Sequence, residues 1–313
     1  MFKRGISFWM IFFLILFVTG FSWAQDKEEM EEEYVVIPIN VSLLPAISTS
    51  SKRFRTINYF KLNVVAGYSD ILKGASLGVV DIVGEDVTGF EGNVVNVVKG
   101  NVSGVQSGVV NVIIGNSTGA QIGVTNFIGS DQVGVQVGVV NYATKVKRLQ
   151  LGVVNITEEA EGIPIGLVSV VLKGGQTHGQ TWFDEQAIVN FAFIHGSKTV
   201  YNIYTAGIDI NDQLWTAGLG LGVQIPLGSL FFKIEGIASG VASLDSSDVK
   251  GFWNRERFYI EYSPFKVLSI IGGVSFNYFR VDEGENFTFS SYGFDVGDDA
   301  SQIWPGFFIG LQF

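Results

Sequence analysis

The amino-acid sequence predicts an all-β fold, an antiparallel transmembrane β-barrel of about 16 strands. Three observations lead to this prediction. The chain is 47% hydrophobic and 16% charged, yet after residue 24 no apolar run is long enough for a membrane-spanning helix. From Gln186 onward, apolar and polar side chains alternate with the period of two that β-strands have. Between residues 78 and 171, the chain repeats a strand-like unit of 15 residues.

Residues 1–24 have the layout of a cleaved secretory signal. Two basic residues precede an apolar stretch at 6–21, and small residues, Ser22 and Ala24, occupy the minus-three and minus-one positions of a cleavage site. The alternative is a retained signal anchor, but no basic cluster follows, and residues 25–33 form an acidic leader. The 18 basic and 30 acidic residues that remain give a formal charge of −12, which disfavours nucleic acid as a partner.

The chain contains no cysteine, which excludes disulfides, thiolate chemistry and attachment of a lipid through cysteine. Any association with a membrane must therefore come from the fold. With two histidines in the chain, we expect no metal site, no cofactor and no enzymatic activity. The alternative is a barrel lipid hydrolase, in which His178, within an expected polar loop, would act as general base.

Residues 176–313 are predicted to form barrel strands. In the segment 214–225, Trp215 and five aliphatic residues share one face, while small or polar residues from Thr216 to Gln224 fill the other. Of the chain's 42 aromatic residues, 26 lie between 176 and 313. Aromatic girdles at both membrane interfaces are typical of transmembrane barrels.

Charged residues lie opposite the apolar stripe in two of these strands. Lys233 and Glu235 alternate with apolar residues in the first, and Arg255, Arg257 and Glu261 do so in the second. This pattern predicts a polar barrel interior. The five residues are the candidate site if the barrel conducts a solute. The alternative is an internal salt-bridge network that fills a narrow lumen.

The last segment, 303–313, is predicted to be the strand that closes the barrel. Tight turn signals at 195–197, 226–228 and 263–266 alternate with longer polar connections, as periplasmic turns alternate with outer loops. The segment resembles the closing strand of bacterial outer-membrane barrels, whose terminal aromatic is read by the barrel-assembly machinery. The resemblance implies an outer-membrane location, with membrane lipid and that machinery as partners. The residues of its apolar face are Ile303, Phe307, Ile309, Leu311 and Phe313.

The block 74–175 consists of seven copies of one unit, Gly-x-Gln-x-Gly-apolar-x-Asn. Asp81 and Ser169 occupy the asparagine position in the first and last copies. Such regularity is typical of repeated supersecondary units, and we expect the asparagines to have a structural role. The asparagines of the other copies are Asn96, Asn111, Asn126, Asn141 and Asn155.

Two architectures fit these repeats. As consecutive antiparallel strands, they would join two N-terminal strands within 34–73 and the C-terminal strands in one closed barrel. As parallel coils of a β-solenoid joined to a smaller barrel, they would stack glutamines and asparagines into hydrogen-bonded ladders. Only 3 of the 42 aromatic residues lie between 74 and 175, which argues against lipid exposure of the block.

The repeats, over roughly residues 58–171, resemble those of bacterial surface-repeat proteins that carry Gly-x-Gln-x-Gly-apolar-x-Asn arrays. That resemblance implies surface exposure without a settled activity. The expected function is therefore a structural or surface-display role in the outer membrane. A passive channel or transport barrel is the alternative, and a lipid hydrolase is a weaker one.

Overall fold

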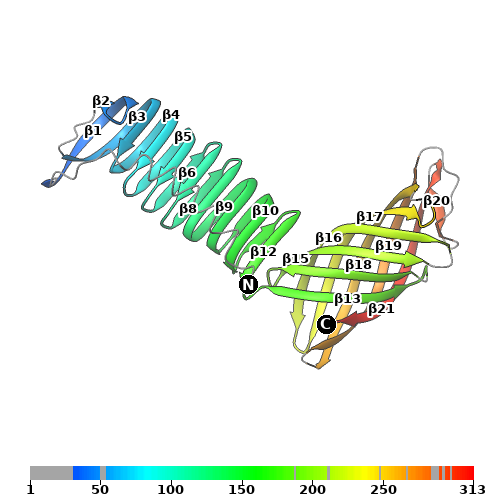
Figure 1. Cartoon of the computed structure of the whole chain (residues 1–313). Coiled ribbons are helices and arrows are strands. Elements are labelled where there is room, and N and C mark those ends of the chain that lie inside the picture. Colours follow the sequence, from blue (N-terminus) through cyan, green and yellow to red (C-terminus); the bar gives the residue numbers. More distant parts are fainter. Residues whose placement is uncertain are drawn as a thin grey trace.

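The computed structural model shows two bodies, a stack of coils in the N-terminal part and a barrel in the C-terminal part (Figure 1). The expected signal, 1–24, and the leader up to residue 30 lie outside the described residues. Across the described part of the chain there are β-strands and no helix, which confirms the all-β prediction. The structure describes residues 31–49, 54–186, 188–209, 212–246, 248–265, 267–282, 289–290, 293–296 and 298–313.

We call the stack of coils the solenoid. It contains β1 (Glu31–Leu44), β2 (Ile47–Ser48), β3 (Phe54–Ser69), β4 (Ile71–Val83), β5 (Val87–Val98), β6 (Val102–Ser107), β7 (Val110–Ile113), β8 (Ser117–Ile122), β9 (Thr125–Val146), β10 (Leu149–Ala160), β11 (Ile163–Ile165) and β12 (Val168–Lys173). The barrel part contains β13 (Gln176–Asp184), β14 (Val189–Gly196), β15 (Val200–Asp209), β16 (Leu214–Leu227), β17 (Leu230–Ser243), β18 (Val249–Phe265), β19 (Leu268–Val281), β20 (Phe294–Val296) and β21 (Asp298–Gln312).

The repeats pair in parallel, each with its equivalent in the next coil. Gln106 of β6 lies beside Glu91 of β5 on one side and Gln121 of β8 on the other. The 16-stranded antiparallel barrel that we expected first is therefore not the structure, which has the alternative architecture of a solenoid and a smaller barrel. The physical reason is a corner within each unit, at Gly108 in this copy and at glycine in every copy but the one with Asn93. It folds 15 residues into one full turn, so the next unit begins one strand spacing further on.

The two expected N-terminal strands also belong to the solenoid. β1 pairs in parallel with β3, and β3 pairs in parallel with β4. Some glycines of the coils have a backbone conformation that L side chains rarely adopt. Gly119 has φ of +134°, and a Cβ there would lie 1.9 Å from the carbonyl oxygen of Gly104 in the preceding coil. These positions require glycine because the coils approach each other through the backbone.

Two side-chain ladders run through the solenoid interior. Asn111 donates from Nδ2 to Asn126 Oδ1 over 2.8 Å, and also to the carbonyl oxygen of Ile122 over 3.0 Å. Gln121 donates from Nε2 to Gln106 Oε1 over 2.9 Å. Asparagine donors thus point toward the C-terminal end of the stack and glutamine donors toward its N-terminal end. The asparagine ladder comprises Asn96, Asn111, Asn126, Asn141 and Asn155, all fully buried.

The ladders begin with charged residues. Glu91 occupies the glutamine position and accepts from Gln106 Nε2 at 2.7 Å. Asp81 occupies the asparagine position and forms a buried ion pair with Lys61 of β3. Lys61 also donates to Ser69 Oγ over 2.9 Å. A buried cation thus lies against the carboxylate of Asp81 in the first coil.

The two edges of the solenoid differ in polarity. At the polar edge, which contains the turns at 84–86, 99–101, 114–116 and 129–131, exposed Asn and Asp side chains accept from backbone amides of the next coil. Behind these turns lie buried aliphatic residues such as Ile113. At the opposite edge, aliphatic side chains between 37% and 58% exposed face outward, and the buried glutamines and asparagines lie behind them. This apolar edge consists of Leu77, Val79, Val94, Val109, Ile122, Val124, Val137, Val139, Val153 and Leu167.

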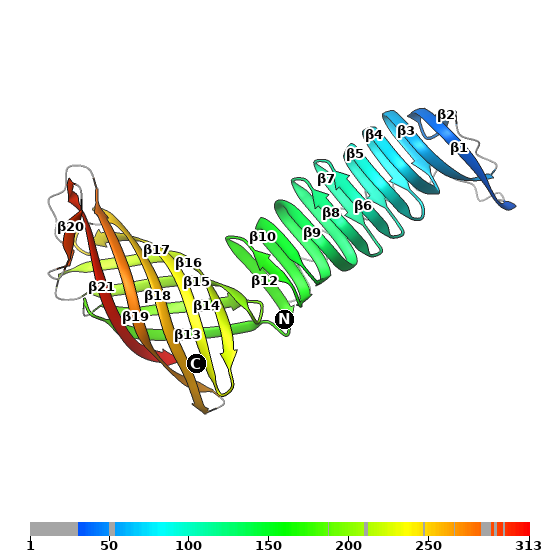
Figure 2. The ribbon, with the colours of Figure 1, turned by 180° about the vertical axis from the view of Figure 1, so that it is seen from behind.

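The barrel has eight antiparallel strands, β13 to β19 and β21, and it closes through pairing of β13 with β21 (Figure 2). Phe313 completes this seam, because its backbone exchanges two hydrogen bonds with Gly179, of 2.8 and 2.9 Å. Its ring is 62% exposed and lies against Gly179. The expected face of the closing strand is confirmed, since Phe307, Ile309 and Leu311 also point outward.

One barrel strand was not anticipated. The segment around His178, which we expected to be a polar loop, is strand β13. It pairs with β14 from Gln176 to Phe183 and with β21 from Gln180 to Asp184. Gln180 and Trp182 point inward and are buried, while Phe183 points outward.

The last coil of the solenoid contacts the outer wall of the barrel on β14 and β15. Asn202 donates to the carbonyl oxygen of Gly166 over 2.6 Å, and the Tyr204 hydroxyl donates to that of Leu167 over 2.9 Å. The amide of Val171 donates to His195 Nε2 over 3.2 Å. The solenoid therefore leaves the barrel at the end where the short turns lie (Figure 1).

Candidate functional site

The five charged residues that the sequence singled out all lie inside the barrel. Lys233 and Glu235 come from β17, and Arg255, Arg257 and Glu261 come from β18. Their side chains are at most 6% exposed. Strand alternation places them on one face, and closure of the sheet brings that face to the interior.

Near the short-turn end, Lys233, Glu261 and Gln312 form a closed triangle. Lys233 Nζ lies 2.6 Å from Glu261 Oε2 and donates to Gln312 Oε1 over 2.9 Å. Gln312 Nε2 donates to Glu261 Oε1 over 2.8 Å. Three strands, β17, β18 and β21, are thereby joined across the interior.

Glu235 is the centre of the next layer. It accepts hydrogen bonds from the hydroxyls of Tyr201 and Tyr259, over 2.9 and 2.5 Å. Its Oε2 lies 3.4 Å from Arg257 Nε in a fully buried ion pair. Gly222 makes room for this layer, because a Cβ there would lie 2.2 Å from the Tyr201 ring.

The two arginines lie against aromatic rings. The Arg257 guanidinium carbon is 4.1 Å from the Trp182 ring centroid and 4.0 Å from that of Phe308. The Arg255 guanidinium carbon is 3.9 Å from the Trp253 ring, and its Nη1 lies 3.0 Å from Asp184 Oδ2. Aromatic faces attract such cations where water is excluded.

At the long-loop end, aromatic residues fill the barrel. Phe289, from the connection between β19 and β20, lies with its ring centroid 4.7 Å from that of Phe279 and 5.0 Å from that of Trp253. Trp304 of β21 is fully buried in the same cluster and donates to Glu185 Oε1 over 2.7 Å. The charged layers and this cluster together occupy the interior from one end toward the other.

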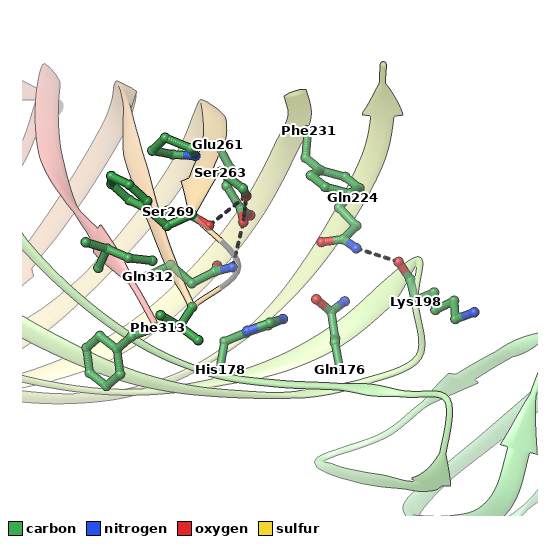
Figure 3. A pocket seen from close by; sticks show the side chains of 14 residues that line it. Gln176, His178, Lys198, Gln224, Phe231, Glu261, Ser263, Ser269, Gln312 and Phe313 are labelled. Atoms are coloured by element: carbon green, nitrogen blue, oxygen red, sulfur yellow. Dashed lines mark hydrogen bonds between the residues drawn. The ribbon is translucent and has the colours of Figure 1, made fainter. Parts of the chain in front are cut away.

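A cavity of about 480 Å³ opens at the short-turn end (Figure 3). Glu261 and Gln312 line it, and both belong to the triangle with Lys233. His178, Ser263 and Ser269 also line it, and Ser263 Oγ is hydrogen-bonded to Ser269 Oγ at 2.7 Å. Among the described residues no hydrogen bond joins His178 to either serine.

The outer wall of the barrel has two polar side chains near its middle. Glu256 and Asn254 alternate with the inward arginines of β18 and therefore face outward. Asn254 Nδ2 lies 3.4 Å from Glu256 Oε1. Both are half-buried.

Sequence reasoning missed the neutral and aromatic partners of the charged residues. Gln180, Tyr201 and Tyr259 all contribute to the interior network, as does Asp184 at the end of β13. Tyr259 could have been found, because it alternates in phase with Arg255 and Arg257. Asp184 could not, because its strand was interpreted as a loop.

Within the described ranges, no group of three or more His, Cys, Asp or Glu side chains is placed to hold a metal ion. No helix of these ranges is long and apolar enough to cross a membrane.

No protein-family model matches the chain, and no curated protein matches it. One solved structure that is similar carries the description "De novo design of transmembrane beta-barrels". The two sequences are 12% identical, and the match covers 45% of this chain and 94% of that chain, with a TM-score of 0.28. A likeness this distant carries no functional argument, and the resemblance to surface-repeat proteins stays an expectation.

Proposed function

We propose that the barrel spans the bacterial outer membrane as a closed anchor and that the solenoid is a structural module held by this anchor. The observation that carries the proposal is the inverted polarity of the barrel. Charged side chains are buried inside it, and large apolar side chains are exposed on its wall. In water this arrangement would be unfavourable, whereas in a bilayer it is the expected one.

Apolar side chains are exposed on the wall strands from β14 onward, whereas β13 presents Thr177, Gly179 and Thr181 beside Phe183. Glu256 and Asn254 are polar wall residues near the middle of β18. The strands have 8 to 17 residues, and about 9 to 11 tilted residues cross a bilayer. The exposed wall residues include Phe183, Phe191, Phe193, Ile208, Trp215, Leu219, Leu221, Val223, Ile225, Phe252, Phe258, Ile260, Ile270, Val274, Phe276, Phe307, Ile309 and Leu311.

The filled interior supports an anchor rather than a passive channel. A solute would have to displace the triangle of Lys233, Glu261 and Gln312, then the stacked Arg257, and finally the aromatic cluster around Phe289. Small barrels of eight strands have an interior just wide enough for side chains to fill.

Barrel topology suggests which side the solenoid occupies. Short turns of outer-membrane barrels face the periplasm, and long loops face outward. The solenoid joins β13 at the short-turn end, beside the turn at 197–199. The proposal therefore places the solenoid on the periplasmic side, rather than on the cell surface as the sequence resemblance implied.

The barrel-assembly machinery remains a proposed partner. Phe313 is exposed at the seam between the first and last barrel strands, where a machinery that closes the barrel would meet it. Phe313→Ala should lower the yield of protein in the outer membrane without changing the barrel that forms in detergent.

Refolding into phosphatidylcholine vesicles tests the proposal. The full chain should float with the vesicles and show heat-modifiable migration, with no steady conductance in a planar bilayer. Leu219→Arg on the wall should impair insertion by about 2 to 4 kcal/mol, whereas Ser246→Arg in the loop between β17 and β18 should not. A chain that stays soluble, or a steady conductance from correctly folded protein, would contradict the proposal.

A further inference from the structure

At the apolar edge of the solenoid, apolar side chains face outward and polar side chains are buried behind them, which is the reverse of the arrangement at the polar edge. In the coil that begins at Val102, Val109 of the apolar edge is 48% exposed, while the buried Gln106 and Asn111 lie on either side of it in sequence. In each of the seven repeats, four residues between the glutamine and asparagine positions form this edge, and none of them is charged. These segments are 77–80, 92–95, 107–110, 122–125, 137–140, 151–154 and 165–168. A continuous exposed apolar surface of this kind marks an interaction site.

Charged residues gather instead at the polar edge. Lys147 pairs with Asp131 over 2.6 Å, and Lys145 pairs with Glu161 over 2.7 Å. These side chains are between 27% and 61% exposed. The polar edge is therefore suited to water, and the apolar edge is not.

The contacts with the barrel fix which edge lies deeper along the wall. Leu167, the last residue of the apolar edge, is bound by Tyr204, which lies opposite Phe193 in the sheet. The chain leaves the solenoid at its polar edge and enters β13 at Gln176, which bonds Ser197 in the short turn. The apolar edge thus starts nearer the middle of the barrel wall than the polar edge does.

The solenoid runs sideways from the barrel rather than along the barrel axis, as both ribbon views show (Figures 1 and 2). If the barrel spans a bilayer, the stack therefore extends along the surface of that bilayer. Because its apolar edge starts on the wall, that edge is the one turned toward the lipid.

We propose that the apolar edge of the solenoid inserts into the acyl-chain border of the leaflet from which the short turns emerge. This inference rests on the proposed transmembrane barrel. The occupant is lipid because the edge is continuous with the barrel wall. The Tyr204 hydroxyl donates to the carbonyl oxygen of Leu167, and its ring centroid lies 6.2 Å from that of the exposed Phe193. Aliphatic side chains without charges at such a border are stabilised by burial of their apolar area.

The absence of cysteine from the chain allows a direct test with single-cysteine variants of the full protein. A polarity-sensitive, thiol-reactive fluorophore attached to Val109→Cys lies on the apolar edge. Ile114→Cys places it on the polar edge of the same coil, and the two native residues are almost equally exposed, at 48% and 50%. Both variants are refolded into phosphatidylcholine vesicles, with or without phosphatidylcholine that carries a spin label high on its acyl chain.

The label at Val109 should emit at shorter wavelength and be quenched by the spin-labelled lipid at least about twofold more than the label at Ile114. Equal quenching at both positions in a heat-modifiable, vesicle-bound protein would overturn this inference and leave the barrel proposal intact. A blue shift at Val109 without lipid quenching would also overturn it, in favour of a second copy as the occupant. Failure of both variants to float with vesicles would refute the barrel proposal itself, and this inference with it.

Discussion

Gln106 donates from Nε2 to Glu91 Oε2 over 2.7 Å, and this pair begins the glutamine ladder of the solenoid. Glu91 is fully buried, and within the described part of the chain its Oε1 has no hydrogen-bond partner. Burial, together with the nearby carboxylate of Asp81, raises the pKa of Glu91 from 4.5 to about 8. A glutamine at this position would extend the ladder without the charge.

The first prediction is that the solenoid loses stability as the pH rises from 4.5 to about 8. In this window folded Glu91 retains its proton while the unfolded chain releases it. The stability that this proton contributes is therefore fully present below 4.5 and is lost across the window, with a total change of at most a few kcal/mol. Glu91→Gln should remove this dependence and raise the urea midpoint at alkaline pH.

Far-ultraviolet circular dichroism in urea follows the strands of both bodies and tryptophan fluorescence follows the barrel, so a transition seen by circular dichroism alone is that of the solenoid. All tryptophans of the described residues lie in the barrel, at positions 182, 215, 253 and 304. Gln121→Glu is the matched control, because it introduces the same carboxyl two rungs further along and should steepen the pH dependence. An unchanged profile in Glu91→Gln would contradict the assignment.

The second prediction concerns the middle of the asparagine ladder. Asn126→Ala removes one bond to Asn141 and one to the Val137 carbonyl, and it leaves the Asn111 donor without its acceptor. Buried unpaired polar groups cost about 1 to 3 kcal/mol each, so the urea midpoint should fall strongly. Asn116→Ala, in the row of exposed Asn and Asp side chains at the polar edge, should lower the urea midpoint much less. Equal losses of stability would argue against the buried ladder as the main contributor.

The third prediction is that Gly119→Ala destabilises the solenoid by at least about 2 kcal/mol. The new Cβ would lie 1.9 Å from a backbone oxygen of the preceding coil, and φ of +134° disfavours alanine in any case. Gly240→Ala in the barrel has nothing within 4 Å of its new Cβ and should be tolerated. Circular dichroism in urea compares the two, and a neutral Gly119→Ala would show that the coils can separate at no cost.

The sequence allowed the barrel strands from β14 onward and the repeat unit to be predicted, because both depend on local alternation. It did not decide between antiparallel and parallel repeats, since a strand with period two and a turn is compatible with either. The decisive feature is that identical polar residues recur at inward positions, where only parallel stacking satisfies them. The scarcity of aromatic residues in the block pointed the same way.

Strand β13 was missed for a different reason. Its outward residues include Thr177, Gly179 and Thr181 beside Phe183, so the apolar stripe that identifies the other strands is absent. Pairing with β14 and β21 supplies the stability that local preference does not. The solenoid junction was equally invisible, because Asn202 and Tyr204 bind backbone carbonyls that have no sequence signature.

The fourth prediction tests whether the interior ion pair acts as a unit. Arg257→Met should destabilise the barrel by about 3 to 5 kcal/mol, because it leaves Glu235 charged and buried. Adding Glu235→Gln should recover at least about 1 kcal/mol, since a neutral amide can still accept from the two tyrosine hydroxyls. Tryptophan fluorescence of vesicle-bound protein in urea measures both, and additive losses would contradict the coupling.

Labelling of single cysteines on intact bacterial cells tests the central claim most directly. Ser246→Cys, in a long-end loop, should react with a membrane-impermeant thiol reagent on intact cells. Ile114→Cys, in the solenoid, should react only after the outer membrane is permeabilised. That result is predicted for a barrel that spans the outer membrane with its solenoid on the periplasmic side. Reaction of Ile114→Cys on intact cells, or of neither variant before permeabilisation, would contradict it.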